Sequence, residues 1–255
     1  MTLMIDSGTD RSSTGHRAPT PIIALDVPDL EAADRLIDRL PAADFYKVGL
    51  QLYTAAGPEI VRRLKDAGHR VFLDLKFHDI PNTVAGAVRS AGALGVDLLT
   101  VHAAGGIPMM RAASEAAAGA SQRPLIFAVS VLTSMGRDEL ARIWGREDAE
   151  PDQEVARLAS IAATAGVDGL VAAVQDVAAV RRSGTRLRFL TPGIRLAGDS
   201  AGDQSRIATP AVAAEAGVDF VVIGRTVTAA PDPASAYARV LEELASRRPS
   251  QTPDL

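Results

Sequence analysis

Charged side chains gather at the end of one apolar stretch of the chain, residues 71–84. Asp74 and Lys76 stand two residues apart within it, and Asp79 follows three residues after Lys76. Side chains two apart on a strand point to the same face, so Asp74 and Lys76 are expected to face one site. An ammonium group held beside carboxylates can transfer a proton, form a Schiff base or stabilise a carbanion. A purely structural ion pair is the alternative interpretation.

The alternation along this stretch predicts a strand that lies between a core and a site. One face is wholly apolar and consists of Val71, Leu73, Leu75 and Phe77. The other face begins apolar and becomes charged, through Phe72, Asp74, Lys76 and His78. Buried charges are costly unless they are paired or used, so the second face is expected to open into a functional site.

Eight apolar segments alternate with helical patterns along the chain. The expected strands are 21–26, 43–49, 70–76, 97–102, 124–129, 169–172, 187–190 and 220–224. The expected helices are 29–40, 53–66, 82–94, 107–119, 137–143, 152–165, 175–182, 208–216 and 232–246. A helix end is joined to an apolar segment three times by the same tripeptide, as Gly95-Val96-Asp97, Gly166-Val167-Asp168 and Gly217-Val218-Asp219. This alternation predicts the α/β class and a single (β/α)8 TIM barrel.

A doubly wound open sheet is the alternative architecture. It would usually carry a glycine-rich fingerprint directly after its first strand. The chain has Asp26-Val27-Pro28-Asp29 at that place, which does not match the fingerprint. The barrel is therefore the favoured fold.

Composition limits the classes of function. The chain has 255 residues, 47% of them hydrophobic, which suits one barrel domain, expected at 19–247 between flexible tails at 1–18 and 248–255. A net charge of −4 argues against a nucleic-acid or membrane-surface partner. The chain has no cysteine, no apolar run near the roughly 18–20 residues of a membrane span and no secretion-signal pattern, so a cytoplasmic location is expected.

Barrel enzymes place their functional groups at the C-terminal ends of the strands. In this chain those ends carry Asp26, Lys47, Asp74, Lys76, Asp79, His102, Thr133, Arg195, Gly224 and Arg225. Loops after strands seven and eight commonly bind phosphate, and Arg225-Thr226 begins an expected short helix that would suit an anion. The sequence shows no zinc-like cluster, so these residues predict a site for a phosphorylated small molecule.

Several of these residues have simpler interpretations. Asp26 and Asp79 could each cap a following helix. Lys47 could form a salt bridge at the rim, and the two arginines could be solvated. His102 is left out of the predicted site, because a histidine at such a position is more often a satisfied rim residue than a catalyst.

Residues 71–84 closely resemble the signature of the orotidine 5′-monophosphate decarboxylase family, and the resemblance extends over residues 21–245. The other matched segments are Ile23-Ala24-Leu25-Asp26, Tyr46-Lys47-Val48-Gly49, Val131-Leu132-Thr133-Ser134, Leu190-Thr191-Pro192-Gly193-Ile194-Arg195, Gly202-Asp203-Gln204-Ser205-Arg206 and Ile223-Gly224-Arg225. The resemblance implies a barrel enzyme that converts orotidine 5′-phosphate to UMP and CO2, the final step of UMP synthesis, without a metal or other cofactor.

The resemblance also implies roles for the matched residues around the base and sugar. Lys76 would stabilise a carbanion at C6 of the pyrimidine and protonate it, while Asp74 faces the scissile carboxylate. Lys47 and Asp26 would hold the ribose hydroxyls and the charge network. Thr133 would lie over the base.

The remaining implied roles concern the phosphate and a second chain. The phosphate end would be bound by Arg195, Gln204, Gly224 and Arg225. Asp79 would belong to the site of the neighbouring protomer, which implies a homodimer, and Thr83 would bind substrate. The implied catalytic residues are Lys76, Asp74, Asp79 and Lys47.

Two other functions compete with this expectation. Related barrel decarboxylases or aldolases that act on keto-sugar phosphates share the D-x-K-x-x-D pattern and use Mg²⁺ to stabilise an enediolate. Phe77-His78, and Thr133 together with Gln204, favour the pyrimidine nucleotide. A non-catalytic barrel would bind UMP without releasing CO2 from orotidylate.

Overall fold

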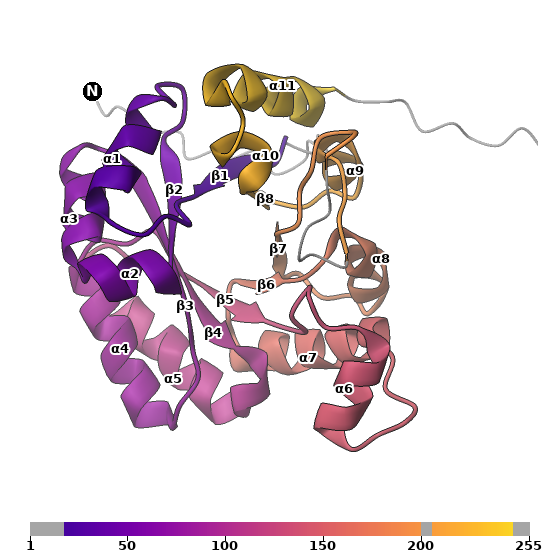
Figure 1. Ribbon diagram of the computed structural model, residues 1–255. Helices are drawn as coiled ribbons and strands as arrows, with labels where there is room; N and C mark the ends of the chain where they lie inside the picture. Colours follow the sequence, from indigo (N-terminus) through magenta and orange to yellow (C-terminus); the bar gives the residue numbers. More distant parts are fainter. Residues whose placement is uncertain (1–17, 200–205, 247–255) are drawn as a thin grey trace, which may run out of the picture.

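Eight parallel strands form a closed barrel in the computed structural model, which describes residues 18–199 and 206–246 (Figure 1). Each strand pairs with the next along the chain, and the last pairs with the first. The strands are β1 (Thr20–Ala24), β2 (Phe45–Gly49), β3 (Arg70–Phe77), β4 (Leu98–His102), β5 (Leu125–Val129), β6 (Gly169–Val171), β7 (Arg188–Thr191) and β8 (Phe220–Ile223). The predicted (β/α)8 TIM barrel is confirmed, and the open sheet is excluded.

Helices surround the barrel on its outside (Figure 1). They are α1 (Leu30–Asp38), α2 (Leu50–Ala56), α3 (Glu59–Asp66), α4 (Pro81–Ala93), α5 (Gly106–Ala118), α6 (Arg137–Trp144), α7 (Pro151–Ala165), α8 (Val174–Arg182), α9 (Pro210–Glu215), α10 (Arg225–Thr228) and α11 (Pro233–Ala245), with a short 3₁₀ turn η1 (Ala103–Gly105). The short helix expected at Arg225-Thr226 is therefore present as α10. Within the described residues, no helix is long and apolar enough to cross a bilayer.

The single helix predicted over 53–66 is wrong, because the chain forms two helices there. Gly57 follows α2 with a φ of 60°, a left-handed value that suits glycine and ends the helix. Pro58 then precedes α3. A glycine followed by proline therefore interrupted a helical pattern that was otherwise continuous.

The buried apolar residues form two clusters, one inside the barrel and one between the strands and the surrounding helices. The inner cluster contains Phe45, Phe72 and Phe127, whereas Val71 and Leu73 belong to the outer cluster under the helices. The alternation predicted for this part of β3 is confirmed. The inner cluster is packed so tightly that a Cβ on Gly169 would lie 2.3 Å from the Phe127 ring, which explains the glycine in β6.

The repeated Gly-Val-Asp tripeptides tie neighbouring strands together at the N-terminal end of the barrel. Their glycines have left-handed φ values, 76° at Gly95, 78° at Gly166 and 70° at Gly217. Each aspartate accepts the N–H of a residue in the preceding strand at 2.8 Å: Asp97 from Val71, Asp168 from Ile126 and Asp219 from Phe189. The repeat thus supports the barrel at the end away from the charged residues.

The domain boundaries remain an expectation. The described barrel begins at Thr20 and its last helix ends at Ala245, inside the range 19–247. The predicted tails, residues 1–18 and 248–255, lie outside the described part of the chain, apart from Ala18.

Candidate active site

A cavity of about 480 Å³ opens at the C-terminal ends of the strands. Its apolar floor is the top of the inner cluster, including Phe72, Leu190 and Val222. Its polar lining includes eight predicted site residues: Asp26, Lys47, Asp74, Lys76, Thr133, Arg195, Gly224 and Arg225. The structure therefore brings together residues that lie up to about 200 positions apart in the sequence.

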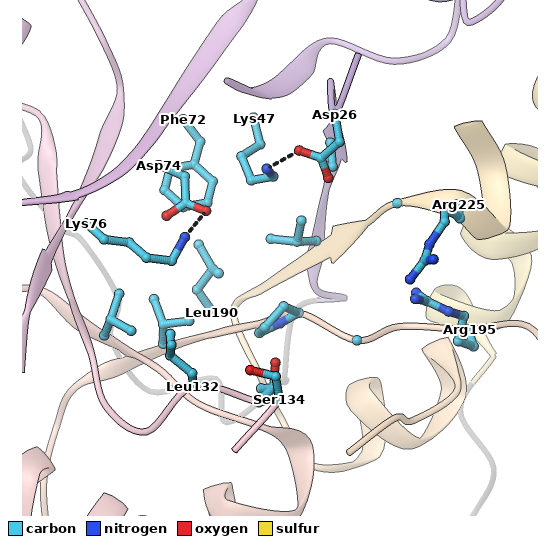
Figure 2. A pocket seen from close by; sticks show the side chains of 18 of the residues that line it. Asp26, Lys47, Phe72, Asp74, Lys76, Leu132, Ser134, Leu190, Arg195 and Arg225 are labelled. Atoms are coloured by element: carbon cyan, nitrogen blue, oxygen red, sulfur yellow. Dashed lines mark hydrogen bonds and ion pairs between the residues drawn. The ribbon is translucent and has the colours of Figure 1, made fainter. Parts of the chain in front are cut away.

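Asp74 and Lys76 form an ion pair on one side of this cavity (Figure 2). The Nζ atom of Lys76 donates to Oδ2 of Asp74 at 2.8 Å. The side chain of Asp74 is 13% exposed and that of Lys76 is 32% exposed, so the carboxylate is sheltered and the ammonium remains accessible. Both point into the cavity, as their spacing predicted.

Thr100 completes this pair and was missed by the sequence analysis. Its hydroxyl donates to Oδ1 of Asp74 at 2.8 Å and accepts the backbone N–H of Lys76 at 3.0 Å. Thr100 lies in β4 and is 1% exposed. A lone hydroxyl in the apolar segment 98–101, on the same face as Leu98 of the inner cluster, is the signal that could have identified it.

The regular alternation of β3 does not continue past Lys76. The pairing of β3 with β4 changes register between Leu73 and Phe77, and Lys76 has a φ of 49°. His78 consequently does not line the cavity, contrary to the predicted face. Its ring stacks on His102 at a centroid distance of 5.2 Å. Burial, then His78 and Lys76, lower the pKa of His102 below its usual range.

Lys47 and Asp26 form a second ion pair in the cavity wall (Figure 2). Nζ of Lys47 donates to Oδ1 of Asp26 at 2.8 Å, and the lysine side chain is 10% exposed whereas the aspartate is 61% exposed. Asp26 does not cap α1, because Asp29 does so by accepting the N–H of Ala32. Lys47 does form a salt bridge, and its side chain is buried in the cavity wall at the end of β2.

Arg195 and Arg225 lie together at another part of the cavity wall, apart from the Asp74–Lys76 pair (Figure 2). Burial is the largest cause that lowers the pKa of Arg195, and the neighbouring Arg225 lowers it further, while Asp199 raises it. Two guanidinium groups held close together suit an anion placed between them. Gly224 lines the cavity beside them and allows close approach to its backbone.

Two predicted site residues of the described chain, Asp79 and Thr83, do not line this cavity. Asp79 is exposed just beyond β3 and accepts the N–H of Ile80 at 2.6 Å. It does not cap α4, whose N-cap residue is Ile80. Thr83 is exposed on the first turn of α4, and Gln204 lies outside the described residues.

The carboxylates of the cavity are engaged by lysines. Asp26 and Asp74 each accept a lysine ammonium at 2.8 Å. Across residues 18–199 and 206–246, no three His, Cys, Asp or Glu side chains are grouped so that they could hold a metal ion. The arrangement can supply a fixed ammonium for charge stabilisation and proton transfer at one place and bind an anion at another.

Known proteins resemble this chain closely. An orotidine 5′-phosphate decarboxylase of Moorella thermoacetica is 50% identical over 236 residues, which covers 90% of this chain and 93% of that protein. One of Synechocystis sp. is 46% identical over 225 residues, or 88% of this chain and 97% of that protein. The crystal structure of orotidine 5′-phosphate decarboxylase from Lactobacillus acidophilus has a TM-score of 0.77 and 34% identity, and covers 90% of this chain and 100% of that one.

The match to the family itself spans the barrel. It covers residues 19–240, which contain every predicted site residue. The resemblance seen in the sequence motifs is thereby confirmed. The chain belongs to the orotidine 5′-phosphate decarboxylase / HUMPS family.

Proposed function

We propose that this protein decarboxylates orotidine 5′-phosphate to UMP and CO2, the final step of UMP synthesis. The observation that carries the proposal is the pairing of Lys76 with Asp74 in a cavity that also presents Arg195 and Arg225. A reactive ammonium and an anion-binding pair are what this substrate requires at its base and its phosphate. The relatives from Moorella thermoacetica and Synechocystis sp. carry the name of this reaction, which supports the same conclusion.

In the proposed step, the bond between C6 and the carboxylate carbon breaks and CO2 leaves. The electron pair stays on C6, where the ring delocalises it poorly. The ammonium of Lys76 stabilises this charge as it forms and then transfers a proton to C6. The lysine, left as a neutral amine, regains a proton from water. No external oxidant or reductant is needed, and we propose that no cofactor takes part.

Asp74 has a positioning task in this scheme. Its Oδ2 holds the ammonium of Lys76 at 2.8 Å, so the proton donor is oriented before the substrate arrives. Lys47 and Asp26 would bind the ribose hydroxyls, since together they offer a donor and an acceptor at the cavity wall. Thr133 would lie over the base.

The phosphate takes no part in bond breaking, but its binding can assist the reaction. Arg195, Arg225 and the backbone at Gly224 are the proposed phosphate ligands, together with Gln204. Binding energy from a remote phosphate can hold the base in line with Lys76, so part of it should appear in kcat.

The proposal includes a homodimer with shared sites. Asp79 is exposed beyond the end of β3, and the exposed side chain of Ile80 next to it is 67% accessible. An exposed apolar residue beside a carboxylate at the barrel rim suits a protein interface. We propose that Asp79 reaches the partner's cavity and that Thr83 binds substrate. Neither a nucleic acid nor a membrane is a proposed partner, and the cytoplasm is the proposed location.

The family name covers a second group, HUMPS, beside the decarboxylases. The alternative of a Mg²⁺-dependent enzyme acting on a keto-sugar phosphate therefore needs its own test. A Mg²⁺-dependent enediolate mechanism needs carboxylate oxygens for the ion. Here Asp26 and Asp74 are each bound to a lysine, which favours the nucleotide.

One assay separates these functions. The purified protein is mixed with orotidine 5′-phosphate, with and without EDTA, and the ultraviolet absorbance of the substrate is followed. We expect the absorbance to fall at the same rate in both samples.

Activity that EDTA abolishes would support the metal-dependent alternative. UMP binding without any release of CO2 would support a non-catalytic barrel.

A further inference from the structure

We infer that Thr100 is a positioning residue for Lys76: it binds the Lys76 backbone directly and supports the ammonium through Asp74. The inference rests on the proposed function, because it assigns Thr100 to the same reaction. It adds a residue from β4 to a group that the sequence motif places on β3 alone.

The geometry is a closed ring of three hydrogen bonds. The backbone N–H of Lys76 donates to Oγ1 of Thr100 at 3.0 Å, and that hydroxyl donates to Oδ1 of Asp74 at 2.8 Å. The other carboxylate oxygen of Asp74 accepts Nζ of Lys76 at 2.8 Å. A hydroxyl has one proton to donate and two lone pairs. Its only proton is therefore directed at Asp74 while it accepts from Lys76.

Lys76 needs this support because its backbone is unusual. Its φ of 49° makes it the single residue other than glycine with a positive φ in the described part of the chain. A Cβ disfavours this conformation. The β3–β4 register also shifts between Leu73 and Phe77, so the regular strand ladder is interrupted around Lys76. The N–H of Lys76 is instead bound by the threonine side chain.

Packing alone does not explain a hydroxyl at this position. The other residues of the segment 98–101 are Leu98, Leu99 and Val101, all buried and apolar. A valine would occupy nearly the same volume as Thr100, but it could neither accept from Lys76 nor donate to Asp74. Strained backbone persists where surrounding contacts hold it, and such strain gathers at functional sites.

The test compares Thr100→Val with Thr100→Ser, which retains the hydroxyl. The matched control is Thr191→Val, since Thr191 is a fully buried strand threonine whose Oγ1 has no hydrogen-bond partner in the described structure. For each variant, kcat with orotidine 5′-phosphate, UMP affinity and the melting temperature are measured. We expect Thr100→Val to lower kcat by about 10- to 100-fold, the factor for lost hydrogen bonds to charged groups. UMP affinity should stay close to that of the wild type, and Thr100→Ser and Thr191→Val should retain kcat.

A crystal structure of Thr100→Val provides a readout that does not depend on turnover. We expect Lys76 to leave its positive φ or its contact with Asp74 in this variant and to keep both in Thr100→Ser. If Thr100→Val does not fold, Thr100→Ala replaces it in the same comparisons. Unchanged Lys76 geometry, or equal kcat in Thr100→Val and Thr191→Val, would overturn the inference.

Failure of the proposed function looks different. In that case the wild type itself would not release CO2 from orotidine 5′-phosphate. The crystal structures of the Thr100 variants would still decide whether Thr100 positions Lys76.

Discussion

The ammonium of Lys76 lies 2.8 Å from Oδ2 of Asp74, which precedes it by two residues on the same strand. This contact holds a cation at one side of a cavity whose wall also carries Arg195 and Arg225. The two regions have different chemical uses, so their contributions to catalysis and to binding can be measured separately.

Replacing Lys76 by alanine should abolish turnover and leave UMP binding largely intact. The substitution removes the proposed proton source and cation, but not the arginines at the phosphate end. Both kcat with orotidine 5′-phosphate and UMP affinity, for example by calorimetry, should be measured. A kcat near that of the wild type would refute the role of Lys76. A parallel loss of UMP binding would indicate that the lysine holds the site together instead.

Arg225→Ala should lower kcat/KM for orotidine 5′-phosphate, with a loss of roughly 2–5 kcal/mol in transition-state stabilisation. This is the range for removing one partner of a charge pair, here the exposed Arg225 and the substrate phosphate that would cover it. The loss should largely vanish with orotidine, which lacks the phosphate. Steady-state kinetics with both substrates tests this. Arg188→Ala is the control, because Arg188 is exposed at the first residue of β7, at the other end of the barrel. An equal loss with both substrates would show that Arg225 acts on folding or on the base.

Chains carrying Lys76→Ala and Asp79→Ala should complement each other when they are unfolded and refolded together. In a mixed dimer, one site has both defects and the other combines an intact Lys76 with the partner's intact Asp79. Random exchange makes half of the dimers mixed, each with one whole site, so activity should recover to about a quarter of wild type. Release of CO2 is measured after mass spectrometry confirms the exchange.

The control for this mixing experiment is Asp74→Ala with Lys76→Ala. Asp74 and Lys76 lie in one cavity of one chain, so every site of their mixed dimer lacks one of them. That mixture should stay inactive. The mixture of Lys76→Ala and Asp79→Ala chains is informative when both parents are inactive and exchange is complete. If that mixture then also stays inactive, the shared-site proposal is wrong.

His102 should make the protein less stable in mild acid. Burial, followed by His78 and Lys76, lowers its pKa in the folded state, whereas the unfolded value is about 6.5. Below about pH 6.5 the unfolded chain therefore binds a proton that the folded chain excludes. The free energy of unfolding consequently rises with pH through this window, and the stabilising contribution of the neutral His102 is fully present above it. Urea unfolding at several pH values gives the free energy of unfolding as a function of pH. This free energy should depend less steeply on pH in His102→Phe than in the wild type.

The comparison for that prediction is His69→Phe. His69 packs against Tyr46 at the opposite end of β3, with ring centroids 5.0 Å apart, and the substitution likewise replaces an imidazole by a phenyl ring. If His102→Phe unfolds with the same pH slope as the wild type, protonation of His102 is not linked to folding.

Asp168→Ala should lower stability and leave kcat unchanged. Asp168 accepts the N–H of Ile126 at 2.8 Å and binds both terminal nitrogens of Arg123 at 3.0 Å. Leaving a strand N–H without its acceptor should cost about 1–3 kcal/mol of unfolding free energy. Urea unfolding and the decarboxylation assay measure the two quantities. Asp38→Ala, at an exposed aspartate that ends α1, is the control. A fall in kcat would mean that this end of the barrel communicates with the site.

The sequence by itself determined the eight alternations, the shared face of Asp74 and Lys76, and the short helix at Arg225. Each of these three features depends on local periodicity or on the end of one strand. None of them requires knowledge of how distant segments meet. The family motifs added roles that composition and spacing do not provide. Gly57 followed by Pro58 is a sequence signal for the break between α2 and α3. The helical pattern on both sides of it nevertheless led to the prediction of a single helix.

Only the tertiary structure decided which partners these residues have. Asp26 binds Lys47 instead of capping α1, because β1 and β2 are neighbours in the barrel. Thr100 contacts Lys76 because the register of β3 against β4 shifts there, and the same shift takes His78 out of the cavity. Register between strands and left-handed backbone depend on the balance of contacts across the whole barrel, which no local pattern in the sequence records.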